Sequence, residues 1–181
     1  MSSGIHATLG ETSTAGSGAR AVRAILAGGL LGGLFDITFA CVAWALRAGV
    51  TPIRVGQSVA AGLLGREASL AGGVATGVLG LVLHFLMAIL MAAVYYGAAT
   101  RIPLLVRHAV PCGLAYGLGL FLVMNFVVMP LSAIGRMGGN GPLVIMIPEI
   151  LVHMFGVGLT IALFTRAALR GAPRAPAPSL A

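Results

Sequence analysis

Four long apolar runs, separated by arginines, constrain the fold of this 181-residue chain more than any other feature. The first covers residues 24–46, is bounded by Arg23 and Arg47, and contains a single charged residue, Asp36. As a helix rising 1.5 Å per residue, such a run crosses the roughly 30 Å hydrocarbon core of a membrane. The other runs cover residues 73–99, 109–134 and 142–165. We therefore predict an all-α membrane protein with four transmembrane helices.

The composition excludes the common soluble classes. Hydrophobic residues make up 59% of the chain and charged residues 8%, whereas a soluble domain carries roughly a quarter charged residues. The net charge of +7 comes from arginines that punctuate the apolar runs, and a nucleic-acid binder needs basic residues gathered on one face. We expect the lipid bilayer as the partner and no nucleic acid.

The segments outside the runs differ in character. Residues 1–20 are rich in small and polar side chains and residues 171–181 in proline and alanine, so both are predicted to be disordered tails around a membrane domain at 21–170. Thr51 and Pro52 form a helix-start signal. Residues 52–66 are predicted to form an additional amphipathic helix, either interfacial, at the membrane surface, or packed as a cap over the bundle. Residues 135–141 are predicted to form a glycine-rich turn.

The connections between the runs carry unequal numbers of arginines. Seven fall on the side of the N terminus and four on the other side. Because basic loops resist translocation, this excess predicts that both termini are cytoplasmic.

Five polar residues interrupt the apolar runs and come from all four of them: Asp36, His84, Asn125, Glu149 and His153. An ionised group at the centre of a membrane helix costs roughly 2.5 to 3.5 kcal/mol, so these side chains are expected to face the bundle interior. Counted from the predicted external ends, they lie about 10 to 15 Å deep. We predict that they form one intramembrane polar cluster.

Three interpretations of this cluster are open. The first is an interhelical hydrogen-bond network that fixes helix rotation, and the second is a path for protons, ions or a small solute. The third is a metal or haem site with His84, His153 and Glu149 as ligands. The chain lacks the CxxCH haem motif, and Glu149 and His153 follow a Glu-x-x-x-His spacing rather than Glu-x-x-His. We therefore predict no cofactor, and we interpret the methionines as filling gaps between helices.

Motifs for catalysis are absent from the sequence. There is no GxxxxGK[ST], GxGxxG or GxSxG, and the chain has four acidic residues in total, which leaves little material for acid–base catalysis. We predict that the protein is not an enzyme. Glycines four apart, such as Gly29/Gly33 and Gly113/Gly117, instead predict close helix packing.

The second half of the chain resembles a known family. The resemblance rests on the run from Cys112 to Gly117, on Met124 and Pro130-Leu131, and on the run from Glu149 to His153, with His84 in the second apolar run. These features are similar to the YagU-like family of small bacterial inner-membrane proteins, over residues 76–170. Residues 51–73 depart from that pattern. The resemblance implies a bacterial inner-membrane helical protein associated with acid tolerance, without an established molecular activity.

Taken together, the sequence favours a non-enzymatic accessory or scaffold protein of the inner membrane, whose partner would be a second copy or another membrane protein. A small transporter or proton-responsive channel that uses the polar cluster is the alternative. A haem- or metal-binding bundle is the second alternative.

Overall fold

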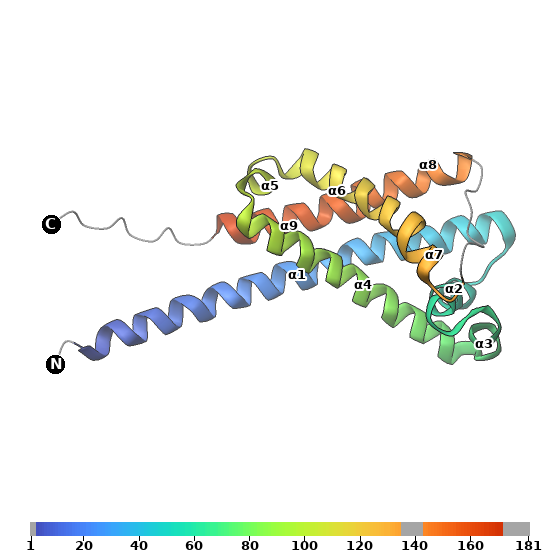
Figure 1. Ribbon diagram of the computed structural model, residues 1–181, viewed down its shortest axis with the longest axis horizontal. Coiled ribbons are helices and arrows are strands. Elements are labelled where there is room, and N and C mark those ends of the chain that lie inside the picture. Colours follow the sequence, from blue (N-terminus) through green and yellow to red (C-terminus); the bar gives the residue numbers. More distant parts are fainter. Residues whose placement is uncertain (1–2, 135–142, 172–181) are drawn as a thin grey trace.

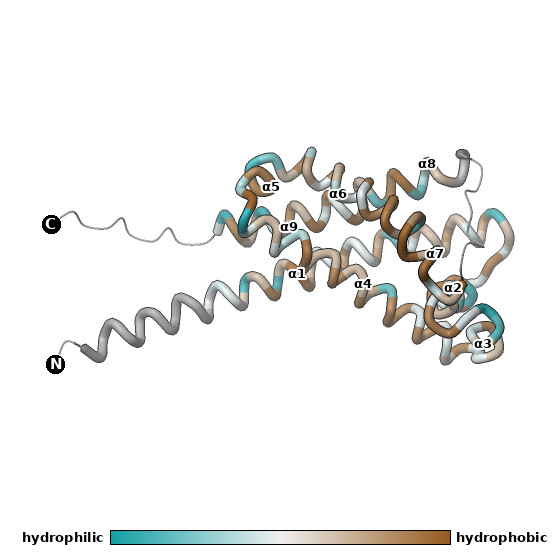
Figure 2. The backbone as a smooth tube through the Cα atoms, viewed as in Figure 1, coloured by the Kyte–Doolittle hydropathy of each residue, from teal (hydrophilic) through white to brown (hydrophobic). Residues whose placement is uncertain are grey.

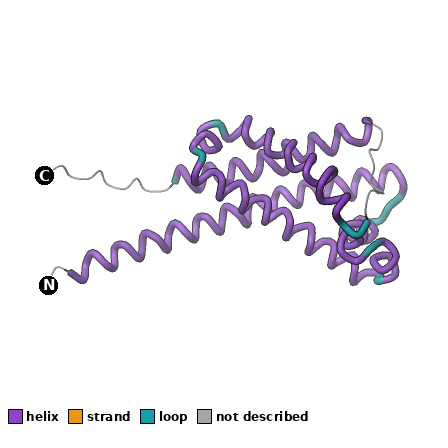
Figure 3. The backbone as a smooth tube through the Cα atoms, viewed as in Figure 1, coloured by secondary structure: helices purple, strands orange, loops and turns teal. Residues whose placement is uncertain are grey.

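The computed structural model describes the backbone of residues 3–134 and 143–171, and in this part of the chain the secondary structure is helical (Figures 1 and 3). The first long helix, α1, covers Ser3–Ala48, and the second, α4, covers Gly73–Arg101. The third runs through α6 (Ala109–Val123), a π-helical turn η1 (Met124–Val128) and α7 (Met129–Leu131). The fourth runs through α8 (Leu143–Leu151), a π-helical turn η3 (Val152–Gly158) and α9 (Leu159–Arg170).

Four stretches of these helices are long and apolar enough to cross a membrane: Gly16–Ala48, Gly73–Arg101, Ala109–Leu131 and Met146–Arg170. This confirms the predicted all-α fold with four spans. In their most apolar windows only 22, 22, 17 and 22% of residues are buried by the rest of the protein. Most of their apolar surface therefore needs another apolar medium around it, which identifies a multi-pass membrane protein.

Helix α4 shows how this surface is arranged. A series spaced four residues apart along it is about half exposed: Val78, Val82, Leu86, Leu90 and Val94. Because residues four apart lie on one helical face, these side chains form an apolar stripe that faces away from the bundle, and Figure 2 shows that most residues of α4 are hydrophobic. This stripe is the lipid-facing side of the span.

The first helix is longer than the sequence predicted. Helix α1 begins at Ser3, within the tail of residues 1–20, and projects beyond the bundle (Figure 1); the disorder of that tail stays a prediction. Once a helix is nucleated, each further residue adds a hydrogen bond at little additional cost, so the span continues into this stretch. The start of α1 and the end of α9 lie at the same end of the molecule. The predicted C-terminal tail and glycine-rich turn fall on residues outside the described ranges.

Two short helices follow α1. Helix α2 (Pro52–Leu64) begins at Thr51, whose side chain accepts a hydrogen bond from the Arg54 backbone N–H, as the start signal predicted. Helix α3 (Arg66–Ala71) then leads into α4. Because Gly56 lies against Gly77 and Gly80 of α4, α2 packs on the first turns of that helix as a cap on the bundle.

The face that α2 buries differs from the expected one. A helical wheel of this segment places Ile53 and Leu63 on the apolar side and Gln57 on the polar side, yet Gln57 is 3% exposed, whereas Ile53 and Leu63 are exposed. The Gln57 side chain donates a hydrogen bond to the Gly73 carbonyl at 2.9 Å, and the Ser69 hydroxyl donates to the Gln57 carbonyl at 2.7 Å. The orientation of α2 is decided by the close approach of its glycine to α4 and by these hydrogen bonds. A helical wheel, which considers only side-chain hydrophobicity, takes account of neither effect.

Short side chains also join the spans. A Cβ on Gly113 of α6 would lie 2.7 Å from that of Ala162 in α9, and one on Gly29 of α1 would lie 2.7 Å from the Ile89 Cα of α4. A buried cluster surrounds these contacts: Ala92, Tyr95, Ala99, Ala109, Leu120, Val157, Ile161 and Ala162. This core lies toward the end of the bundle that carries α5 (Pro103–Arg107), called below the α5 end; the opposite one, with α2 and α3, is called the α2 end.

Candidate functional site: an intramembrane polar cavity

The structure brings all five predicted polar residues to one cavity of about 550 Å³. Asp36 comes from α1, His84 from α4, Asn125 from η1, Glu149 from α8 and His153 from η3. The sequence predicted that these side chains converge. In the structure they line a cavity and are not closely packed against one another. Polar groups that line a cavity can meet water or a solute.

The cavity extends from the middle of the bundle to its α2 end. Along α1 its wall runs from Asp36 past Ala43 and Trp44 to Arg47, and Val59 of α2 also lines it. Arg47 follows Asp36 by eleven positions along the helix, a rise of about 16.5 Å. Arg47 is exposed, so the polar cluster lies at the bottom of a vestibule that reaches the surface.

His153 holds the centre of the cluster. Its Nδ1 atom lies 2.9 Å from the Glu149 carbonyl oxygen and 3.5 Å from an oxygen of the Asp36 carboxyl. Both partners are acceptors, so we assign the proton to Nδ1. The Nε2 atom then carries a lone pair when the ring is neutral and a second proton when it is charged. Asp36 is the group placed to stabilise the charged ring.

His84 is oriented in the same manner. Its Nε2 atom lies 2.9 Å from the backbone carbonyl oxygen of Gly33 in α1. Because a carbonyl can only accept, Nε2 donates and Nδ1 carries the lone pair of the neutral ring. The bond joins α4 to α1 and fixes the imidazole at the cavity wall.

Both π-helical turns supply residues to the cavity. In η1, the Asn125 side chain donates a hydrogen bond to the Phe121 carbonyl at 3.0 Å, and in η3 His153 binds the Glu149 carbonyl. Each side chain thus binds the carbonyl four residues before it, which an α-helical turn reserves for the backbone N–H of that same residue. The widened turns redirect the following side chains, and such turns occur frequently at functional sites.

Charge is distributed unevenly along the cavity. The Glu149 carboxyl interacts electrostatically with His153 and Asp36 and also with Arg47. Two carboxyl groups and two imidazoles lie deep in the wall, and among the lining residues in the described part of the chain Arg47, near the mouth, is the one permanent cation. A cation or a proton is better suited than an anion to the bottom of this cavity.

Sequence reasoning missed several residues of the wall. Trp44, Met87 and Met124 line the cavity, whereas the methionines had been interpreted as filling gaps. A signal was present: Met87 follows His84 by three residues, so the two share a helical face. Trp44 carries no comparable signal, because its place depends on how α1 packs.

A metal centre of the usual kind is not present in the described part of the chain, where no three or more His, Cys, Asp or Glu side chains are grouped so that they could hold an ion. Neither the known protein families, nor the curated proteins, nor the solved structures contain a match to this chain.

Proposed function

We propose that this chain is a small, proton-responsive transporter of a cation, and that the cavity between α1, α4, η1, α8 and η3 holds the transported ion. One observation carries the proposal: Asp36, His84, Asn125, Glu149 and His153, from four separate spans, line a cavity whose wall extends to Arg47 and Val59 at the α2 end. A bundle held together for structural reasons alone would close around such groups, whereas here a cavity of about 550 Å³ remains beside them although Asp36 and His153 are paired.

The arrangement of His153 supports coupling to protons. Imidazole can change its charge within the physiological pH range, and the Asp36 carboxyl lies 3.5 Å from the protonated nitrogen. A proton gained at Nε2 brings positive charge to the bottom of the cavity and opposes a bound cation there. Protonation and cation binding therefore compete, which is the coupling that an exchanger requires.

The closed α5 end supports a carrier rather than an open pore. Below the cluster, the close-packed core with Tyr95, Ala109 and Ile161 fills the bundle. A cavity open at one end and sealed at the other fits one state of an alternating-access cycle. Transport then requires a second state, open at the α5 end.

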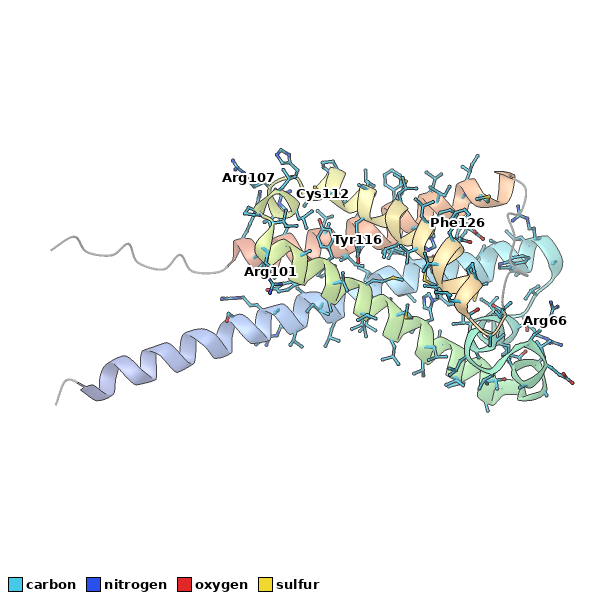
Figure 4. The ribbon with its side chains drawn as sticks, viewed as in Figure 1. Arg66, Arg101, Arg107, Cys112, Tyr116 and Phe126 are labelled. Atoms are coloured by element: carbon cyan, nitrogen blue, oxygen red, sulfur yellow. The ribbon has the colours of Figure 1, made fainter. Side chains whose placement is uncertain are left out.

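The arginines support an orientation. Arg101 and Arg107 lie at the α5 end and Arg66 at the α2 end (Figure 4). The excess of arginines at the α5 end favours placing this end in the cytoplasm, and with it both termini. The cavity would then open outward from a bacterial inner membrane. The YagU-like resemblance, which implies acid tolerance, agrees with a cavity that senses protons outside the cell.

The test is proton flux in proteoliposomes loaded with a pH-sensitive dye and driven by an inward gradient of a monovalent cation, with a panel of such cations tried in turn. Because each entering cation would be exchanged for a proton, we expect the wild-type chain to raise the lumen pH faster than protein-free vesicles do with at least one of them, and Asp36→Asn, Glu149→Gln and His153→Ala to abolish most of this difference. Glu67→Gln is the matched control, since Glu67 is an exposed carboxyl in α3 that does not line the cavity.

A wild-type rate equal to that of empty vesicles would overturn the proposal, and so would a rate unchanged in all three cavity variants. Either result would favour the accessory or scaffold role, in which the chain acts through a second copy or another membrane protein.

A further inference from the structure

A second, smaller cavity adjoins the deep end of the polar cluster. It measures about 60 Å³ and shares Asp36, His84 and His153 with the larger cavity. Its remaining polar or polarizable side chains are three methionines, Met87, Met91 and Met124. Three thioethers, two imidazoles and one carboxyl thus surround a space large enough for a bare ion, since a single water needs only about 10 to 15 Å³.

The sequence places these groups on few elements. His84, Met87 and Met91 lie at positions i, i+3 and i+7 of α4 and therefore share one helical face. Met124 reaches the cavity from η1 and His153 from η3, so both π-helical turns contribute a group with a free electron pair. Filling a gap would not require these methionines to gather beside two histidines.

The tautomers leave electron pairs available. His84 donates through Nε2 to the Gly33 carbonyl, and His153 donates through Nδ1 to the Glu149 carbonyl. The lone pairs are therefore on His84 Nδ1 and His153 Nε2. A metal-binding histidine commonly donates its other ring N–H to a carbonyl or carboxylate in this way, which fixes the ring and raises its basicity.

We propose that this inner cavity binds a monovalent soft metal cation of the copper(I) or silver(I) class through thioether sulfur and imidazole nitrogen. Thioether ligands select such ions, whereas carboxylate and water ligands suit magnesium, calcium or manganese. The Asp36 carboxyl supplies the compensating negative charge. The inference names the cation for the proposed transport cavity and in that respect rests on the proposed function, but binding is measured without flux.

The experiment uses the full chain purified in detergent, with the free thiols of Cys41 and Cys112 blocked by N-ethylmaleimide because they would otherwise bind silver(I) themselves. The blocked chain, in chloride-free buffer, is titrated with silver(I) and followed by calorimetry and by the methyl NMR signals of ¹³C-labelled methionine. We expect one ion per chain and shifts of the Met87, Met91 and Met124 signals, with Met146 unmoved because it lines neither cavity. Zinc(II) in place of silver(I) should bind more weakly.

The matched variants are the triple substitution Met87→Leu, Met91→Leu and Met124→Leu, which keeps side-chain size, and the control Met146→Leu. Loss of an outer partner alone costs a metal site about 10- to 100-fold in affinity, so loss of three ligands should cost more than about 100-fold. The control should bind as the wild type does. If the triple variant does not fold, the NMR signals of the wild-type chain decide the question.

Three results would overturn the inference: absence of silver(I) binding to the folded wild-type chain, binding by the triple variant equal to that of the wild type, or tighter binding of zinc(II) than of silver(I). Specific silver(I) binding without proton flux would support this site and overturn only the proposed transport. Proton flux without silver(I) binding would support the proposed transport and overturn only this metal site.

Discussion

The same four spans pack tightly at one end of the bundle and surround a cavity at the other end. At the α5 end, residues such as Ala92, Ala162 and Tyr95 are at most 2% exposed, and glycines bring the backbones of α6 and η3 together. At the α2 end, the spans separate around a cavity of about 550 Å³. In lipid, association depends on packing and interhelical hydrogen bonds, so the first end supplies the attraction that lets the second remain open.

The boundary between the two ends lies where the polar cluster begins. Gly117 of α6 lies against the backbone of His153 and Met154, which fixes η3 just beside the imidazole. Gly33 of α1 packs on Phe85 and Ala88 and offers its carbonyl to His84. The comparison therefore indicates that close packing on one side of this level holds the polar groups on the other in position.

The largest expected effect is steric, at Gly158. A Cβ there would overlap the backbone of Gly113 and Gly117, so Gly158→Ala should lower the free energy of unfolding by about 3 kcal/mol, the upper part of the range for overpacking. The measurement is reversible unfolding in mixed micelles. Gly119→Ala is the control: a Cβ there meets nothing within 4 Å, and alanine favours the helix. Equal stability of the two variants would contradict the conclusion that the α5 end is held together by close backbone packing at glycine.

A pair of identical enlargements compares the two ends directly. Ala162 is 0% exposed in the packed core, and Ala43 lines the cavity. We expect Ala162→Leu to cost about 2 kcal/mol through overpacking and Ala43→Leu to cost less than about 0.5 kcal/mol, as for a substitution at an open site. Thermal unfolding of both variants in the same detergent checks this. A larger loss for Ala43→Leu would show that the cavity region is as tightly packed as the core.

The smallest expected effect concerns the ion pair inside the cavity. The side chains of Asp36 and His153 remain 24% and 17% exposed, and hydrogen bonds between membrane helices contribute about 0.6 kcal/mol on average. Asp36→Asn should therefore change stability by less than about 1 kcal/mol while it removes proton flux. A loss of stability as large as that of Gly158→Ala would assign Asp36 to the structural framework instead.

Much of the fold could be predicted because the bilayer imposes its own pattern. The length and spacing of the apolar runs determined four spans, and the high cost of polar groups in hydrocarbon determined that Asp36, His84, Asn125, Glu149 and His153 face one another. Thr51 and Pro52 determined the start of α2 by local chemistry. Each of these inferences needs only composition, periodicity or a local motif.

Tertiary structure alone decided whether the converging groups would be packed against one another or would surround a space. It also decided that Gln57 is buried, that η1 and η3 widen into π-helical turns, and that three methionines from two spans meet beside two histidines. These features depend on how closely the backbones approach and on how each helix is rotated about its axis. Neither quantity can be predicted from the hydrophobicity of the sequence. Almost every face of these helices is apolar enough either to contact lipid or to pack inside the bundle.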